Sequence, residues 1–502
     1  MKLNTTIAAI ATPPGMGAIA VIRLSGEDAV SICEEIFLPA EKGLRLAELA
    51  VGSLHLGKIH DNSEIIDEVL LSIFRSPRSY TGEDIIEVSC HGSVYIQQKI
   101  LQLLLDHGAE PAKPGEFTQR AFLNGKMDLS QAEAVADLIA SGSAAFHKVA
   151  MQQMRGGFSG EIKNLRKQLL DFISLVELEL DFSEEDVEFA DRTELKVLVD
   201  TITAMLELLI SSFSLGNALK NGIPVVIAGK PNTGKSTLLN KLLMEEKALV
   251  SEIPGTTRDS IEDVIHLEGI SFRFIDTAGI HEATDKVEIM GIERTMEKIR
   301  QAGIILFMAE ATDTAGHIDH LIEGLLEKTD FSDKTIILLL NKADLLKGEE
   351  DLPAERAADG TGGVEGRSGP SKSNKPAPGP DEGISIFNKQ TFPALREKDH
   401  MLEISAKTGS GLEKLKSLLV SIIHHGRSIE NDIIVTNIRH YHALSNAHEA
   451  AVRASTGLET ALSGELLAMD IREVLYHLGE ITGEITTDEI LGNIFKNFCI
   501  GK

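Results

Sequence analysis

A short glycine-rich segment, 229-GKPNTGKST-237, most constrains what this chain can fold into. It fits the pattern G-x-x-x-x-G-K-[ST], in which glycines let the backbone curl and point its N–H groups at phosphate oxygens. The apolar run 223-IPVVIAG-229 before it predicts a buried strand, and 236-STLLNKLL-243 after it has the apolar spacing of a helix. This strand–loop–helix order predicts an α/β domain whose helix N-terminus adds partial positive charge to a phosphate site.

Single side chains of this region have predicted roles. Lys235 is expected to reach the β- and γ-phosphates of a nucleotide, and the Ser236 hydroxyl to bind Mg²⁺. Further along, Thr257 is expected to close on Mg²⁺ and the γ-phosphate, with Thr256 beside it. The nucleotide-binding residues predicted here are Asn232, Thr233, Gly234, Lys235, Ser236 and Thr237, followed by Ser251, Glu252, Ile253, Pro254, Gly255, Thr256 and Thr257.

Three later segments indicate that the nucleotide carries guanine, namely 276-DTAG-279, 341-NKAD-344 and 405-SAK-407. Asp276 is expected near the Mg²⁺ shell, and the Gly279 N–H near the γ-phosphate. The Asp344 carboxylate can accept hydrogen bonds from guanine N1–H and the N2 amino group, which adenine cannot offer, so it predicts selection of GTP over ATP. The other predicted contacts are Thr277, Ala278, Asn341, Lys342, Ser405, Ala406 and Lys407.

The residue after the DTAG segment leaves open which group orients the attacking water. Many small GTPases have a Gln there, whereas this chain has Ile280. Glu282, Asp285 and Glu288 are nearby carboxylates that could handle a water, although on the residues alone each is more simply a solvated loop charge.

Length and charge exclude several classes of protein. A chain of 502 residues is long enough for about three domains. Its net charge of −27 argues against coating of nucleic acid through bulk electrostatics, and the acidic stretch 177–194 is interpreted as a solvated helix end rather than a metal site. Three separated cysteines form neither a disulfide framework nor a zinc cluster and suit a reducing cytoplasm. We expect no membrane span, because no uninterrupted apolar run reaches that length.

Apolar periodicity divides the chain into four predicted parts. Residues 1–122 alternate short strands with turns and contain a helix near 93–107, which predicts a small α+β domain. Helical patterning dominates 123–218 and resumes over 426–502, after the nucleotide domain at 219–425. We therefore expect one all-α helical domain into which a Ras-like P-loop domain is inserted. The segment 347–383 is rich in Gly, Pro and Ser, and it predicts a disordered surface insert at about 347–398.

Five segments are more specific than the nucleotide motifs, which many unrelated GTPases share. They are 11-ATPPGMGAIAVIRLSG-26, 80-YTGEDIIEVSCHG-92, 114-PGEFTQRAFLNGKMDLSQAEA-134, 255-GTTRD-259 and 498-FCIGK-502. Through them the chain resembles the MnmE (TrmE) family of tRNA-modification GTPases nearly end to end. The insert at about 347–398 is longer than we expect for that family.

The resemblance implies a reaction and its partners. A flavin- and NADH-using protein, MnmG (GidA), would join this chain in a heterotetramer or larger complex. Together they would add an aminomethyl or carboxymethylaminomethyl group to C5 of the wobble uridine of certain tRNAs. A 5-formyl- or methylene-tetrahydrofolate would carry the one-carbon unit. The N-terminal domain would bind this folate and form a homodimer, in the cytoplasm and away from membranes.

The resemblance also assigns residues to the folate. Arg23, Glu87, Lys126 and Lys502 match the family's folate contacts, because Glu87 can pair with the N–H groups of a pterin and the three cations suit an anionic folate. Cys499 matches a cysteine near the family's active site and is a candidate catalytic or substrate-positioning thiol, although a lone Cys is more often a packed apolar residue.

For GTP hydrolysis, the resemblance implies that two nucleotide domains meet face to face and bind K⁺, whose charge takes the place of an arginine finger. Asn232 matches the K⁺-coordinating Asn. The loop 251–256 matches the K⁺ loop, through the carbonyls of Ser251 and Ile253 and a contact at Thr256. Glu288 matches the glutamate that activates water through a bridging water, which makes it a predicted catalytic residue together with Lys235.

Two other functions stay open at this point. An RNA-binding GTPase of ribosome assembly would keep every nucleotide motif, but it should carry a basic RNA-binding module where this chain has acidic helical flanks and the FCIGK tail. A stand-alone folate enzyme with a regulatory GTPase would transfer one-carbon units without MnmG or tRNA.

Overall fold

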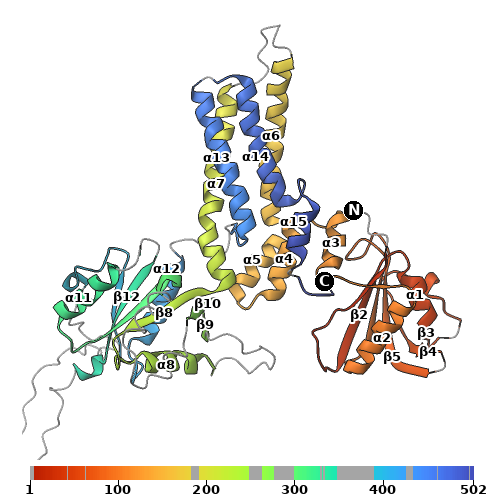
Figure 1. Cartoon of the computed structure of the whole chain (residues 1–502), viewed down its shortest axis with the longest axis horizontal. Helices are drawn as coiled ribbons and strands as arrows, with labels where there is room; N and C mark the ends of the chain where they lie inside the picture. The colour runs from red at the N-terminus through yellow and green to blue at the C-terminus, as the bar shows by residue number, and fades with distance from the viewer. Residues whose placement is uncertain are drawn as a thin grey trace, which may run out of the picture. The chain divides into compact units, whose positions relative to one another are not determined.

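The computed structural model describes residues 5–41, 43–62, 64–181, 192–247, 263–275, 299–327, 331, 334–346, 389–424, 433–460, 462–496 and 498–501. The chain forms two compact units. The first comprises Met1–Ser141, Phe146–Gly216 and Ile433–Lys502, and the second comprises Gly142–Ala145 and Asn217–Asp432. The first unit therefore takes chain from both sides of the second (Figure 1).

The first unit begins with a seven-stranded sheet in the order β3-β4-β5-β6-β2-β1-β7. Neighbouring strands are antiparallel except for β1 and β7, which are parallel. The strands are β1 (Ile7–Ile10), β2 (Ile19–Ser25), β3 (Phe37–Pro39), β4 (Leu54–Asp61), β5 (Glu64–Phe74), β6 (Ile85–His91) and β7 (Glu110–Pro111).

Period-two alternation gives this sheet one apolar face. The helices α1 (Ala29–Ile36) and α2 (Val94–Asp106) and the short 3-10 turn η1 (Leu46–Glu48) contribute to the core on that face. Ile22 of β2, Val88 of β6 and Ile100 of α2 are fully buried in it. Because successive side chains alternate, Arg23 and Glu87 lie on the opposite face, directly across from each other in neighbouring strands.

Four long helices of the described chain form a bundle in the first unit (Figure 1). They are α6 (Gly157–Asp181), α7 (Arg192–Asn221), α13 (Ile438–Glu459) and α14 (Gly464–Thr482). Their shared core contains Leu206, Leu444 and Leu478, and the face that α13 turns to it is rich in buried alanines. Small side chains on this face let the neighbouring helices approach closely.

Shorter helices join the bundle to the sheet. They are α3 (Glu116–Leu123), α4 (Leu129–Ala140), α5 (Ala144–Met154) and α15 (Asp488–Phe495). The start of α4 is a capping box, in which the Asp128 side chain accepts from the Gln131 N–H at 3.0 Å and the Gln131 side chain accepts from the Asp128 N–H at 3.0 Å. The sequence D-L-S-Q therefore sets where α4 begins.

Helix α7 qualifies one expectation from the sequence. It is long and apolar enough to cross a membrane by length and composition alone, whereas no such stretch was expected. Its residues Leu195, Ile202 and Leu209 are buried in the core of the bundle. A core helix passes the same test of length and composition, so this helix is weak evidence for a membrane span.

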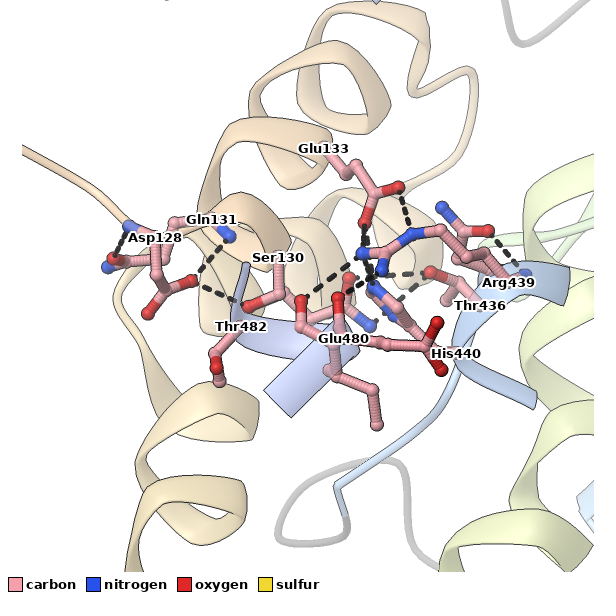
Figure 2. A network of polar contacts seen from close by, with 12 residues as sticks. Asp128, Ser130, Gln131, Glu133, Thr436, Arg439, His440, Glu480 and Thr482 are labelled. Carbon is pink, nitrogen blue, oxygen red and sulfur yellow. Dashed lines mark hydrogen bonds and ion pairs between the residues drawn. The ribbon is translucent and has the colours of Figure 1, made fainter. Parts of the chain in front are cut away.

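A buried polar junction ties the start of α13 to α4 and α14 (Figure 2). The Glu133 carboxylate accepts from Arg439 Nε at 2.9 Å and Nη2 at 2.7 Å, and it lies 2.6 Å from His440 Nε2. Arg439 also donates to the carbonyls of Glu480 at 2.6 Å and Ile481 at 3.2 Å. Below, "polar junction" means Glu133, Arg439, His440 and these two carbonyls.

The second unit contains a six-stranded sheet in the order β13-β12-β11-β8-β10-β9, parallel except between β9 and β10. The strands are β8 (Ile223–Gly229), β9 (Asp263–Leu267), β10 (Ile270–Phe274), β11 (Ile304–Glu310), β12 (Thr335–Asn341) and β13 (His400–Glu403). The near-continuous apolar runs of β11 and β12 are typical of parallel strands that are buried on both faces. The carboxyl ends of β8, β12 and β13 lie at one edge of this sheet, where ligands bind in such folds.

The helices of the second unit are α8 (Lys235–Lys247), α11 (Ala315–Leu326) and α12 (Leu412–His424), with 3-10 turns η2 (Ala343–Leu345) and η3 (Lys389–Thr391). The prediction that the disordered insert extends to residue 398 is wrong at its C-terminal end, because the structure describes packed chain from residue 389 on. Phe392 is fully buried in the core of this unit, and Arg396 forms an ion pair with the buried Asp399 at 2.7 Å. An aromatic anchor and a buried carboxylate fix this stretch, and residues 347–388 of the insert lie outside the described residues.

Candidate functional sites

The phosphate loop connects β8 to α8 through three residues with positive φ angles. These are Gly229 at 149°, Asn232 at 65° and Gly234 at 97°. A Cβ atom at Gly229 would lie 2.3 Å from the Met308 carbonyl oxygen, and one at Gly234 would lie 2.3 Å from Asn341 Nδ2. Both glycines of the motif are therefore required by space as well as by backbone conformation.

Lys235 begins α8 and folds back over the loop. Its Nζ donates to the carbonyls of Gly229 at 2.8 Å and Lys230 at 2.7 Å. Burial lowers the pKa of this ammonium group. Ser236 and Thr237 follow in the first turn of the helix, and Thr233 Oγ1 donates to the Lys230 carbonyl at 2.9 Å. A cation, a helix start and curled backbone thus meet at one place, which suits a polyphosphate.

Asn341 joins three of the predicted nucleotide segments. It is 3% exposed at the end of β12. Its Nδ2 donates to the Thr233 carbonyl of the phosphate loop at 2.7 Å, and its Oδ1 accepts from the Ala406 N–H at 2.9 Å. The structure therefore brings the phosphate loop, the NKAD segment and the SAK segment together, and Asn341 holds them through both ends of its amide.

Asp344 is an ionised acceptor beside this junction. A hydrogen bond from Ser405 lowers the pKa of the Asp344 carboxyl, and the charge of Lys407 lowers it further. Ser405 is itself 1% exposed, so the carboxylate is oriented by a fixed group. Lys342 precedes it in a left-handed conformation with φ 64°. The structure thus brings Asp344, Ser405 and Lys407 together.

Other predicted residues lie outside the described residues. They are Ser251, Glu252, Ile253, Pro254, Gly255, Thr256, Thr257, Asp276, Thr277, Ala278, Gly279, Ile280, Glu282, Asp285, Glu288 and Lys502. Within the described part of the chain, no group of three or more His, Cys, Asp and Glu could hold a metal ion. Ser236 is therefore the described member of the predicted Mg²⁺ set, and Asn232 that of the K⁺ set.

Arg23 and Glu87, two of the predicted folate residues, are paired on the face of the first sheet opposite its main core. Arg23 Nε donates to Glu87 Oε1 at 2.8 Å, and its Nη2 lies 2.7 Å from the same oxygen. The guanidinium carbon lies 5.7 Å from the ring centroids of both Tyr80 and Phe117. Tyr80 is held in turn by a 2.9 Å hydrogen bond between its hydroxyl and Thr118 Oγ1. The guanidinium group of the ion pair thus packs against two aromatic rings.

The C-terminal tail reaches the same region. The Gly501 carbonyl accepts from Arg23 Nη1 at 3.4 Å, and the Gly115 N–H donates to the Cys499 carbonyl at 3.3 Å. A Cβ atom on Gly501 would lie 2.5 Å from the Ile10 carbonyl oxygen, so the tail packs directly on β1. Cys499 is exposed beside this contact. The tail and the Arg23–Glu87 pair are brought together, although they stand at opposite ends of the chain.

Lys126 lies at a loop near the same sheet. Its Nζ donates to the Pro77 carbonyl at 2.8 Å, and its methylenes would be 3.4 Å from a Cβ atom on Gly82. The described contacts of Lys126 are thus with the 77–82 loop rather than with the Arg23–Glu87 pair.

Three features of these sites are absent from the sequence predictions. They are the bridging role of Asn341, the aromatic seat of Arg23, and Glu310, which accepts a hydrogen bond from Lys342. The first two depend on contacts between distant segments. Glu310 could have been found from the sequence, because it is the acidic residue that ends an otherwise apolar run, 304-IILFMAE-310.

Comparison with known proteins covers the whole chain. A family model described as the MnmE helical domain matches residues 129–499, and one described as the GTP-binding protein TrmE N-terminus matches residues 6–126. A protein named tRNA modification GTPase MnmE from Christiangramia forsetii is 51% identical over 510 residues, which cover 100% of both chains. One of the same name from Bacteroides thetaiotaomicron is 50% identical over 497 residues and 99% of each chain.

Proposed function

The chain belongs to the MnmE (TrmE) family of tRNA modification GTPases, and we propose that it couples GTP hydrolysis to modification of C5 of the wobble uridine of certain tRNAs. The observation that carries this proposal is the 51% identity that extends over the full length of a relative. The added aminomethyl or carboxymethylaminomethyl group would take its one-carbon unit from a tetrahydrofolate. The flavoprotein MnmG would be the partner, and the chain would act as a homodimer in the cytoplasm.

Different residues of the described nucleotide site would bind the phosphates, the guanine base and Mg²⁺. The loop N–H groups and the start of α8 would receive the phosphates, and Lys235 would exchange its two carbonyl contacts for phosphate oxygens. The ionised Asp344 would accept from the guanine N1–H and N2 amino group. Ser236 offers a hydroxyl oxygen of the kind that Mg²⁺ prefers, and a bound Mg²⁺ would neutralise charge between the phosphates.

We assign the K⁺ site to Asn232 and the loop 251–256. The side-chain amide of Asn232 supplies a hard oxygen donor, and the residue stands in the phosphate loop with a φ of 65°. Ser251, Ile253 and Thr256 would complete the donor set, and a bound K⁺ would offset charge that develops between the β- and γ-phosphates. Glu288 would hold the proton-accepting position for water, through a second water.

The Arg23–Glu87 pair is the centre of the proposed folate site. Seated on Tyr80 and Phe117, it presents a carboxylate that suits the adjacent N–H groups of a pterin ring. Lys126 and Lys502 would pair with the anionic part of the folate. The tail contact at Gly501 would bring the Cys499 thiol toward the bound one-carbon carrier.

Comparing K⁺ with Na⁺ tests the proposal. The full chain should hydrolyse GTP faster in K⁺ than in Na⁺ at matched ionic strength, and Asn232→Ala should remove the difference. Glu288→Ala should abolish hydrolysis in both salts while GTP still binds. Equal rates of the unchanged protein in the two salts would contradict the K⁺ assignment, and K⁺-stimulated turnover by Glu288→Ala would contradict the role given to Glu288.

A further inference from the structure

We propose that Glu310 is a positioning residue of the guanine site, which holds Lys342 in the conformation that meets the base. Glu310 ends β11, and its Oε1 accepts a hydrogen bond from Lys342 Nζ just after the end of β12. The two residues are 32 positions apart, and Glu310 belongs to none of the nucleotide motifs. The inference rests on the proposed guanine site and adds a residue to it.

The sheet fixes the distance between the two side chains. Strands β11 and β12 run parallel, with Glu310 opposite Asn341 in the register. One residue on, the Ala311 N–H donates to the Asn341 carbonyl at 2.8 Å. Asn341 is in turn locked to the phosphate loop and the SAK segment. The Glu310 carboxylate is therefore attached to the same rigid framework that carries Asp344.

The position of Lys342 next to the proposed base site explains why its hydrogen bond to Glu310 matters. Lys342 lies two residues before Asp344, and its side chain is 33% exposed, so its stem is accessible to a base that Asp344 would hold. A purine held at its edge by Asp344 has two flat faces that need apolar cover. The methylene stem of a lysine can supply it only while the chain stays extended. Without an anchor, ordering this stem would weaken binding through lost rotamer freedom.

The predicted consequence differs from that of an ordinary ion pair. Partly exposed pairs contribute little to folding stability, and Glu310 is 28% exposed at its side chain. Preorganising a side chain that touches a ligand instead acts on affinity. We therefore expect Glu310 to change the dissociation constant of guanine nucleotides and to leave the melting temperature unchanged.

The first test replaces Glu310 in the full-length protein. Glu310→Ala should raise the Kd for GDP, measured by displacement of the fluorescent probe mant-GDP, by about two- to tenfold. KM for GTP should rise in proportion while kcat stays the same. IDP, which lacks the N2 amino group, should lose affinity by the same factor, because the face of the base rather than its edge is affected. Glu323→Ala, an exposed carboxylate on α11, is the matched control and should change none of these values.

A double-mutant cycle identifies the route of the effect. If Glu310 acts through Lys342, Lys342→Ala should weaken GDP binding, and adding Glu310→Ala to it should cause no further loss. An unchanged Kd in Glu310→Ala, or a full additional loss in the double variant, would overturn the inference. Failure of the unchanged protein to bind mant-GDP would instead overturn the proposed guanine site. A silent Lys342→Ala would overturn the role of Lys342, and with it the inference.

Discussion

Replacing Glu133 by alanine tests how strongly the polar junction holds the helical bundle (Figure 2). The change removes both hydrogen bonds to Arg439 and the contact with His440. Removing one partner of a buried ion pair destabilises a protein by about 3–5 kcal/mol. Arg439 is 22% exposed and keeps the Glu480 and Ile481 carbonyls, so we expect the low end, about 3 kcal/mol.

The titration of Glu133 reflects the same contacts and sets an upper bound on the effect. Burial raises its pKa, but the charges and hydrogen bonds of His440 and Arg439 outweigh burial and lower the pKa from 4.5 to about 2. That shift corresponds to at most about 3 kcal/mol at pH 7, because the part that comes from the charge of His440 is present only where this ring is protonated. Because the folded pKa is the lower one, this stability is present above pH 4.5 and is lost as the pH falls from 4.5 toward 2.

His440 adds a second acid-sensitive term with the same sign. Burial lowers its pKa below 6.5, although the adjacent Glu133 carboxylate raises it. We therefore expect the ring to be neutral at pH 7, with Arg439 as the cation that faces Glu133. The unfolded chain takes up this proton more readily, so stability falls as the pH drops below 6.5.

Hydrogen exchange of the α13 amides measures these free energies in the full-length protein, because it reports the opening that exposes this helix. Glu133→Ala should lose about 3 kcal/mol at pH 7, and Glu133→Gln about half of that. Glu459→Ala, which breaks an exposed pair with Lys196, is the control and should lose about 0–1 kcal/mol. A loss in Glu133→Ala no larger than in this control would refute the reasoning, as would an unchanged loss of stability below pH 4.5 in Glu133→Gln.

Two further predictions concern the tail and the cysteines. Gly501→Ala should undock the tail, since φ is 93° and the Cβ atom would lie 2.5 Å from the Ile10 carbonyl oxygen. Modification of tRNA in the presence of MnmG should then fall about tenfold or more while K⁺-stimulated GTP hydrolysis persists, and normal modification would disprove this role of the tail. Burial raises the pKa of Cys33 to about 12 and that of Cys90 to about 11, whereas Cys499 is exposed. Iodoacetamide should therefore label Cys499 in the native protein and the other two only in denaturant, as read by peptide mass spectrometry; rapid native labelling of Cys33 would contradict the structure.

The nucleotide site illustrates how far prediction from sequence extends. The strand and the helix predicted on either side of the phosphate loop are found at β8 and α8. These elements follow from apolar runs and glycine positions, which are local properties of the chain. The end of the insert was predicted too far along the chain. The burial of one aromatic residue, Phe392, fixes the chain there, and the average composition of a segment does not show the effect of one buried residue.

The amino-acid sequence by itself determined the strand–loop–helix unit around the phosphate loop, the guanine-nucleotide motifs and the family to which the chain belongs. Each of these depends on residues that are neighbours along the chain. Only the tertiary structure decided which partners those residues meet. Asn341 reaches Thr233 across 108 positions, and Arg439 reaches Glu133 across 306. Such contacts depend on strand register and helix packing, which a local pattern does not encode.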